Sequence, residues 1–394
     1  SSNNDVSERV FSGLKALEYR GYDSWGLAVR ATASHPRLVR QVGKISDASL
    51  DDMSGSEALG HTRWATHGEV STTNTHPHRS GSITLVHNGI VENHQALREE
   101  LAGQGYEFVS QTDSEVLAAW IDWQFATHAD HIHSLAQVVE GISGRSAVVF
   151  MHDKYEGVFA FTTGLPLVIN AREEETAIAS DPLAFGGETN QVVYLDSGQA
   201  GYFNKNNREF YALTEQSSFV PVYETLSLGG AQALAHADGC HMLSEILEQP
   251  DLAAQAISQE AAIANLAQQI TKSEKVYLIG CGTAHKVAML GAYYLRTAGV
   301  DAQAIVASET QEYHTLVDAD TLCIAISQSG ETADVLSGVE AMQTSGASLA
   351  AIVNVSHSSL ARRADTVVDI QAGVEQAVAS TKAAMNQIVL LYQA

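Results

Sequence analysis

The chain has 394 residues, 45% hydrophobic and 17% charged, which predicts two or three globular domains and excludes a disordered chain. Its formal net charge of −24 disfavours a nucleic-acid partner, because a protein that binds a phosphate backbone needs the opposite sign. Such an acidic surface fits either a salty milieu or solubility alone. No run of about 18 apolar residues and no signal-peptide pattern are present, and three widely spaced cysteines form no CxxC pair. We therefore predict a cytoplasmic protein without membrane span, disulfide framework or zinc site.

The first half of the chain has the pattern of an α+β domain. Its first predicted helix has a candidate cap at Asn4 or Asp5 and apolar positions at helical spacing, namely Val6, Val10, Leu14 and Leu17. Short β-type runs then dominate as far as residue 223, at 27–29, 83–86, 147–150, 158–161, 167–169 and 192–195. Two more helices are predicted at 92–102, with Gly103 as C-cap, and at 114–126, where Thr112 and Glu115 have capping-box spacing. Many strands with few helices between them indicate antiparallel sheets.

The second half changes to a regular alternation of strands and helices. Residues 226–241 are predicted to be an irregular linker and residues 242–269 to be helical with a break at Pro250, so the linker between the domains is placed at 226–250. Strands are expected at 276–279, 321–326, 349–355 and 366–370, with helices between them. This order predicts a doubly wound parallel sheet. The predicted domains are therefore 1–225 and 251–394, joined by the linker.

Polar side chains suited to a small zwitterion gather at 60–68, 87–89 and 112–113. Arg63 can hold an α-carboxylate with two hydrogen bonds, and Asp113 can hold an α-ammonium. Asn88 and the backbone N–H of Gly89 can donate to an oxyanion.

Each of these residues has a simpler interpretation. In that interpretation Arg63 is a surface charge and Asp113 is a helix cap. His67 and His76 are then buried histidines or, with His78, metal ligands; their spacing and the lack of a nearby carboxylate disfavour a metal.

The grouped motifs resemble a known family. Gly60-His61-Thr62-Arg63-Trp64-Ala65-Thr66-His67-Gly68, His87-Asn88-Gly89 and Thr112-Asp113 resemble the glutaminase domain of the isomerising glutamine:fructose-6-phosphate aminotransferases, the glucosamine-6-phosphate synthase family. The resemblance implies an Ntn-hydrolase-like αββα sandwich. It also implies an oxyanion hole of Asn88 and Gly89 and a glutamine site of Arg63, Trp64, Thr66, His67, Gly89 and Asp113.

Three loops of the second half are rich in small hydroxyl residues, at 280–283, 327–332 and 379–381. In a parallel sheet, ligands bind beyond the carboxyl ends of the strands, where hydroxyls and helix N–H groups hold a phosphate without a lysine. A dinucleotide fingerprint fails because its third glycine would fall at His285, and no P-loop is present. Helix capping is the common use of one such loop, but three at one sheet edge favour a phosphate site.

These loops resemble the sugar isomerase (SIS) domain of the same family, through Cys281-Gly282-Thr283-Ala284, Ser327-Gln328-Ser329-Gly330-Glu331-Thr332 and the segment 375–382. The resemblance implies a sugar-phosphate site lined by Thr283, Ser327, Gln328, Ser329, Thr332 and Ser380. Ala284 stands where the family has a serine, which removes one hydroxyl from the first loop.

The resemblances imply glutamine-dependent conversion of fructose 6-phosphate to glucosamine 6-phosphate by a homodimer without metal or organic cofactor. The SIS loops disfavour amidotransferases that make phosphoribosylamine or asparagine. The family's nucleophile is an N-terminal cysteine, and a second SIS domain follows the first. Because the alignment begins after the cysteine strand and stops inside an apolar helix, we expect an internal portion of a longer enzyme. The alternative is a catalytically silent protein that binds glutamine or a sugar phosphate.

Overall fold

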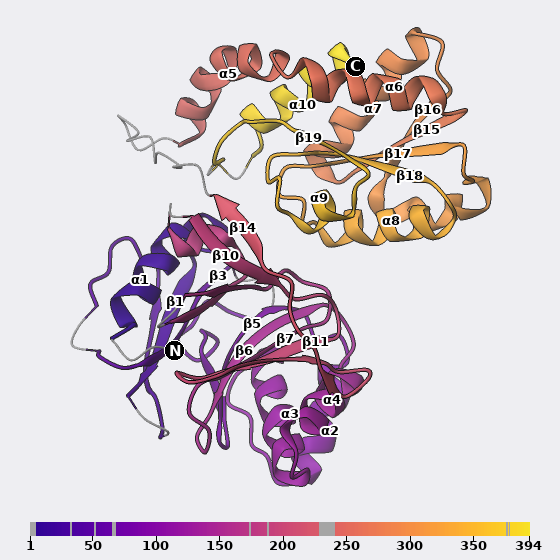
Figure 1. Cartoon of the computed structure of the whole chain (residues 1–394). Helices are drawn as coiled ribbons and strands as arrows, with labels where there is room; N and C mark the ends of the chain where they lie inside the picture. Colours follow the sequence, from indigo (N-terminus) through magenta and orange to yellow (C-terminus); the bar gives the residue numbers. More distant parts are fainter. Residues whose placement is uncertain are drawn as a thin grey trace. The chain divides into compact units, whose positions relative to one another are not determined.

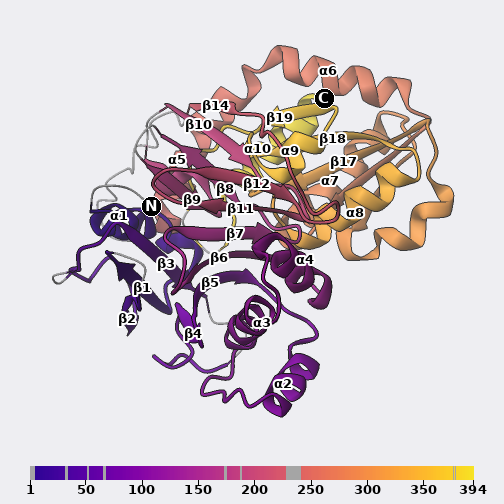
Figure 2. The same ribbon diagram turned by 60° about the horizontal axis from the view of Figure 1, so that its bottom comes forward.

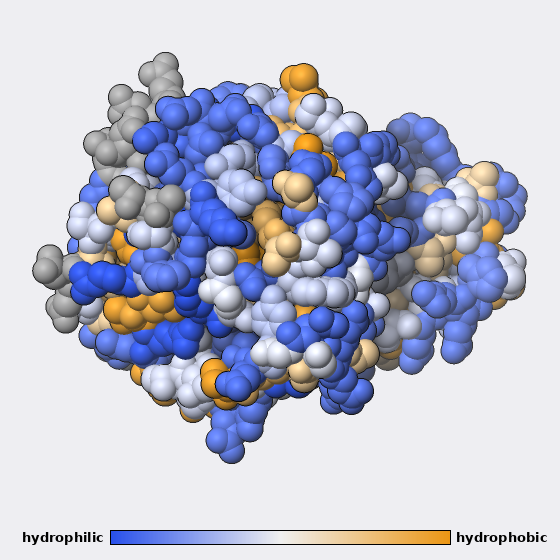
Figure 3. All heavy atoms as spheres, turned by 90° about the horizontal axis from the view of Figure 1, so that it is seen from below, coloured by the Kyte–Doolittle hydropathy of each residue, from blue (hydrophilic) through white to orange (hydrophobic). Residues whose placement is uncertain are grey.

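The computed structural model describes residues 5–31, 34–50, 53–64, 68–172, 175–186, 189–227, 241–375, 377 and 379–394 (Figure 1). The chain divides into two compact units, residues 1–230 and 231–394. The face seen in Figure 3 is mostly hydrophilic with apolar residues in small groups, in keeping with the net charge of −24. Among the described helices, none is both long and apolar enough to cross a lipid bilayer.

The first unit is built from antiparallel strands. In chain order its elements are α1 (Ser7–Ala16), η1 (Glu18–Arg20), β1 (Ser24–Arg30), β2 (Arg37–Val42), β3 (Glu57–Arg63), β4 (His78–Ser80), β5 (Ile83–Gly89), α2 (His94–Gly103), α3 (Asp113–Thr127), α4 (His131–Gly141), β6 (Ser146–His152), β7 (Val158–Thr162), β8 (Val168–Ala171), β9 (Thr176–Ala179), η2 (Pro182–Phe185), β10 (Thr189–Tyr194), β11 (Gln199–Phe203), β12 (Arg208–Ala212), β13 (Ser217–Ser218) and β14 (Glu224–Ser227). They form sheets of seven, four and three strands, in the orders β13-β12-β11-β7-β6-β5-β4, β14-β10-β8-β9 and β2-β1-β3.

Alternation along the strands produces the layers of this unit. Val148 and Phe150 of β6 belong to the core under α2, α3 and α4, which cover one face of the seven-stranded sheet (Figure 2). Their neighbours Ala147 and Met151 belong to the core shared with the four-stranded sheet. On the other side, α1 packs Phe11 against the three-stranded sheet. The order helix, sheet, sheet, helix confirms the predicted αββα sandwich.

Two helix ends differ from the prediction, and one helix was missed. Gly103 lies inside α2, and Gly105, at φ +92°, has the left-handed conformation that ends the helix. The capping box of α3 is half formed, because Thr112 Oγ1 accepts the Glu115 N–H (3.3 Å) while the Glu115 carboxylate binds the backbone of residues 109 and 110. α4 was not predicted, although the side chain of Asp130 caps it at the His133 N–H (3.1 Å).

The second unit is a parallel α/β sheet with strand order β16-β15-β17-β18-β19. Its elements are α5 (His241–Ile257), α6 (Glu260–Lys272), β15 (Lys275–Gly280), α7 (Gly282–Thr297), β16 (Ala302–Val306), η3 (Ala307–Leu316), β17 (Thr321–Ser327), α8 (Ala333–Thr344), β18 (Ser348–Val353), α9 (Ser359–Arg363), β19 (Thr366–Asp369) and α10 (Lys382–Gln393). Val276 and Leu278 of β15 pack towards α6, α7 and α10, and Tyr277 and Ile279 pack towards α8 and α9. Helices cover both faces, which confirms the doubly wound prediction.

The predicted break at Pro250 is wrong. α5 continues through this proline to Ile257, and the chain leaves the helix at Ser258 and Gln259. Proline in a helix interior costs about 3 kcal/mol, and the packing of α5 along α10 offsets that cost. α5 begins at His241, next to the predicted start of the helix at residue 242, and residues 228–240 lie outside the described residues. β16, η3 and α9 were not predicted.

Candidate functional site

Asn88 and Gly89 lie at the carboxyl end of β5, where the strand leaves the sheet. Asn88 pairs with Ala147 of β6 and Gly89 pairs with Ser146 of β6. Asn88 and Gly89 are both exposed. Gly89 has φ +131°, and a Cβ atom there would lie 2.1 Å from the carbonyl oxygen of Arg145. Only glycine fits this conformation and this close approach. The backbone that presents the candidate oxyanion donors is therefore fixed by the residue type.

Arg63 ends β3 with its side chain turned into the protein, so the surface-charge interpretation is wrong. The residue is 6% exposed, and its Nη1 donates to the carbonyl of Glu69 (3.3 Å). Burial lowers the pKa of Arg63, while the nearby carboxylates of Asp23 and Asp113 favour its charged form. Asn74 holds the same Glu69 carbonyl (3.1 Å) and so fixes the loop under the guanidinium.

Asp113 is the first residue of α3 and is tied to the end of β5. Its Oδ2 accepts the N–H of Val91 (2.8 Å), two residues after Gly89. The next residue, Ser114, contacts Nδ1 of His87 (3.0 Å), so two successive residues of α3 hold the strand that carries Asn88. The structure thus brings Asn88, Gly89 and Asp113 together, with the Arg63 guanidinium within electrostatic reach.

The other predicted glutamine-site residues are less determined. Trp64 is 46% exposed, and its ring centroid lies 5.5 Å from that of Tyr22. Thr66 and His67 lie outside the described residues. Their roles stay predictions.

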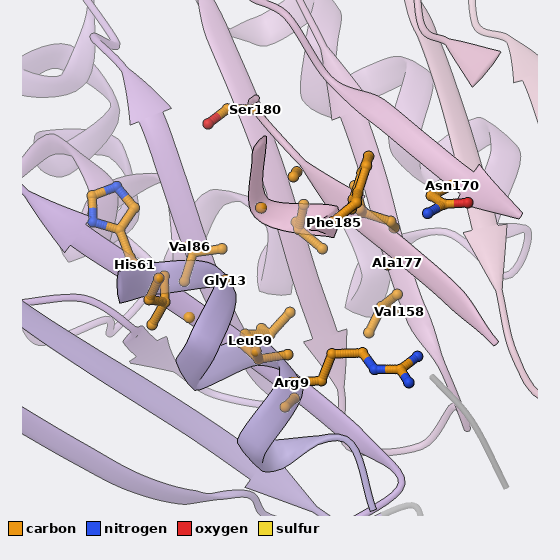
Figure 4. Close-up of a pocket in the computed structure, with 18 of the residues that line it drawn as sticks. Arg9, Gly13, Leu59, His61, Val86, Val158, Asn170, Ala177, Ser180 and Phe185 are labelled. Atoms are coloured by element: carbon orange, nitrogen blue, oxygen red, sulfur yellow. The ribbon is translucent and has the colours of Figure 1, made fainter. Parts of the chain in front are cut away.

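The first unit contains a largely apolar cavity of about 180 Å³ (Figure 4). Asn88 is one of the residues that line it. Residues 58–61 of β3 line one side and all of β9 lines the other. Each of these strands is the last of its sheet among the described residues, so their facing edges have no strand partner there. Val86 of β5 and Val158 of β7 line the cavity between them, and α1 contributes Gly13 and Leu14.

Three histidines, His61, His76 and His78, pack against one another. His61 stacks on His76 with ring centroids 4.1 Å apart, and His76 meets the ring of His78 edge-on at 4.7 Å. Neither ring nitrogen of His76 has a hydrogen-bond partner among the described residues. Within that part of the chain, no three His, Cys, Asp or Glu side chains are arranged to hold a metal. His76 is buried, as the simpler interpretation predicts, and so is His78; His67 lies outside the described residues.

In the second unit, two helices leave neighbouring strands towards opposite faces of the sheet. β15 and β17 are paired neighbours, with Ile279 opposite Ala325, and α7 and α8 follow them. In open α/β sheets this switch point is where ligands bind. Thr283 is the second residue of α7 and is exposed, and the loop 327–332 leads into α8. Five of the six predicted sugar-phosphate residues thus lie at one switch point.

Hydrogen bonds to its own serine side chains fix the backbone of the loop 327–332. Ser327 Oγ accepts the N–H of Gly330 (2.9 Å), and Ser329 Oγ accepts the N–H of Glu331 (3.2 Å). Gly330 has φ +66°, and a Cβ atom there would lie 2.0 Å from Ser358 Oγ. The loop therefore requires this glycine and presents several hydroxyls at the N-terminus of α8.

Two family models match separate parts of this chain. A glutamine amidotransferase domain model matches residues 61–186, and a SIS domain model matches residues 269–394. Glutamine–fructose-6-phosphate aminotransferase (isomerizing) of Vibrio vulnificus strain YJ016 is 35% identical over 414 residues, covering 98% of this chain and 66% of that protein. The same enzyme of Idiomarina loihiensis is 37% identical over 409 residues, with the same two shares. This chain is homologous to these aminotransferases over 98% of its length.

The chain spans 66% of the length of these aminotransferase relatives. Among solved structures, the glutamine phosphoribosylpyrophosphate amidotransferase of B. subtilis aligns with 94% of this chain and 90% of its own, at 18% identity and a TM-score of 0.48.

Sequence reasoning missed two features of this chain. His87 was assigned no role, yet hydroxyls of Ser114 and Ser146 (3.1 Å) hold both of its ring nitrogens and fix β5. Ser380 was grouped with the phosphate loops, yet its hydroxyl donates to Glu375 (2.9 Å) within its own segment. Only the position of His87 directly before Asn88 could have drawn attention to it.

Acid is expected to destabilise the first unit through its histidines. Burial, reinforced by neighbouring histidines and arginines, lowers the pKa of His61 and of His78 to about 3 and that of His76 well below 6.5. Above pH 6.5 the rings are neutral in both states. Below it the unfolded chain binds protons that the native state excludes, so each ring removes about 1.4 kcal/mol per pH unit until its native pKa is reached.

The measurement is urea unfolding followed by tryptophan fluorescence, since all four tryptophans (Trp25, Trp64, Trp120 and Trp123) lie in the first unit. His76→Phe keeps an aromatic ring in place. Between pH 6.5 and 4.5 the unfolding free energy of this variant should fall less steeply than that of the wild type, by about 1.4 kcal/mol per pH unit. An identical decline in the variant and the wild type would contradict this assignment.

Proposed function

We propose that this protein acts in the glutamine-dependent conversion of fructose 6-phosphate to glucosamine 6-phosphate, with glutamine in the first unit and the sugar phosphate in the second. The observation that carries the proposal is the presence, in one chain, of a glutamine amidotransferase domain and a SIS domain with a hydroxyl-rich switch-point loop. The proposed domains are a glutaminase at 1–225, a linker at 226–250 and a first SIS domain at 251–394.

In the proposed glutamine site, Arg63 binds the α-carboxylate and Asp113 the α-ammonium. Asp113 has acceptor capacity left after it accepts the Val91 N–H, because an ionised carboxylate offers about four lone-pair sites. Asn88 and the N–H of Gly89 stabilise the oxyanion that forms when the side-chain amide is attacked. Trp64, Thr66 and His67 complete the proposed contacts to glutamine.

Hydrolysis of the amide also needs a nucleophile beside Asn88, and the resemblance assigns this part to a cysteine thiol. A thiol could reach Asn88 through the cavity between β3 and β9, because Asn88 lines that cavity and each of these strands ends its sheet there among the described residues. Binding of glutamine needs only the residues that this chain contains, so binding is the sharper test of the site.

In the proposed sugar site, the phosphate binds to Thr283, Ser327, Gln328, Ser329 and Thr332, and Ser380 lies at the sugar end. Hydroxyls and helix N–H groups suit a dianion in a chain with a net charge of −24, because they stabilise the phosphate without adding lysines. Ammonia from the glutaminase then aminates the sugar. In this proposal the protein acts in the cytoplasm as a homodimer and uses no metal or organic cofactor.

Ser329→Ala is expected to weaken fructose 6-phosphate binding about tenfold to a hundredfold, because it removes a hydrogen bond to a charged ligand. The measurement is isothermal titration calorimetry on the full chain. Ser345→Ala is the matched control, since Ser345 lies just beyond the opposite end of α8 and its hydroxyl donates to the Ala341 carbonyl (3.0 Å). Equal affinities in the Ser329 variant and wild type would return the loop to a capping role and refute the proposal.

A further inference from the structure

Helix α5 holds the segment that precedes α10 with two carboxylates. Glu245 is 1% exposed, and its Oε1 accepts the N–H of Ala377 (3.0 Å). Glu248 Oε2 accepts a hydrogen bond from Lys382 Nζ (2.8 Å), and Lys382 is 4% exposed. A buried ammonium must be paired, so this ion pair fixes the N-terminus of α10 against α5.

A third carboxylate occupies the N-terminus of α10. Glu375 accepts the N–H groups of Thr381 (2.7 Å) and Ala383 (3.2 Å) and the hydroxyl of Ser380. These donors would otherwise attract an anion. A phosphate placed here would meet a carboxylate instead, which favours the loop 327–332 as the phosphate site.

Asn354 joins the two regions. Its backbone N–H donates to the carbonyl of Gln328 (3.1 Å) in the phosphate loop. Its side chain accepts the N–H of Ala372 (2.9 Å) and donates to the carbonyl of Gly373 (2.6 Å), at the start of the segment that leads to Ser380. One residue therefore sets the spacing between the loop and the segment.

We propose that Glu248, Lys382 and Asn354 are positioning residues that set the distance between the phosphate loop 327–332 and Ser380. This rests on the proposed function, because the distance matters only to a ligand that spans both regions. Inorganic phosphate engages the loop alone. Fructose 6-phosphate needs the loop and the segment at a fixed separation.

The test compares the affinities of the full chain for fructose 6-phosphate and for inorganic phosphate by calorimetry. Glu248→Gln and Asn354→Ala should each weaken fructose 6-phosphate about tenfold and leave inorganic phosphate unchanged within about twofold, since misplacement affects only the spanning ligand. The exchanged pair Glu248→Lys with Lys382→Glu should recover most of the loss. Glu340→Gln is the charge-matched control, because Glu340 forms an exposed ion pair with Arg363 (3.8 Å).

Unchanged fructose 6-phosphate affinity in both single variants would overturn the positioning role. So would an equal loss of both ligands, because that is the result of general loosening. A wild-type protein that binds inorganic phosphate but not fructose 6-phosphate would overturn the proposed function itself. The variants and the wild type thus distinguish the two failures.

Discussion

Arg63→Ala is expected to weaken glutamine binding at least about a hundredfold, because it removes a buried, charged, two-point contact to the α-carboxylate and leaves that carboxylate unpaired. Fructose 6-phosphate binding should not change, since its proposed site lies in the other unit. Calorimetric titration of the same variant with each ligand measures both effects.

Arg79→Gln is the matched control for this prediction. It also removes a guanidinium from the first unit, but Arg79 binds Thr84 (3.0 Å) and Asp153 near the other end of β5 from Asn88. This variant should keep its glutamine affinity. Loss of both ligands from the Arg63 variant would contradict the assignment of two separate sites.

The second large effect is expected in stability. Arg30 of β1 is 2% exposed and bonds Glu57 of β3 and the carbonyls of His152 (2.9 Å), Tyr155 (2.7 Å) and Gly157 (2.7 Å). It therefore joins the three-stranded sheet to the turn between β6 and β7. Arg30→Met should lower the free energy of unfolding of the first unit by about 3–5 kcal/mol, because the Glu57 carboxylate would stay buried without its partner.

Tryptophan fluorescence during urea unfolding measures this loss in the first unit alone. Arg9→Met is the control, because Arg9 also bonds a carboxylate, that of Glu175, but its side chain is 56% exposed and the pair should contribute about 1 kcal/mol or less. The double variant Arg30→Met with Glu57→Gln should lose less than the sum of the two single losses, since no uncompensated charge remains. Strictly additive losses would show that the pair is not coupled.

The sequence predicted those features that depend on local pattern. Short β-type runs located β5, β6 and β7, and the hydroxyl-rich loops located the switch point of the parallel sheet. The motif residues Asn88, Gly89 and Asp113 are brought together because β5 and α3 are joined by the Asp113–Val91 bond. Short-range chemistry at strand and helix ends is legible in a sequence.

Features decided by distant partners were not predictable. Pro250 lies inside α5 because that helix packs along α10, more than a hundred residues later in the chain. The hydroxyl of Ser380 is used by Glu375, and Lys382 is buried because Glu248 of α5 reaches it. Residue type alone does not reveal which of several possible partners a polar group finds in the fold.

The most direct test of the two-site account is a titration of fructose 6-phosphate into the full chain already saturated with glutamine. The account predicts that the sugar phosphate still binds saturably, because each ligand occupies its own unit. Competition, in which saturating glutamine abolishes sugar-phosphate binding and the reverse, would contradict it.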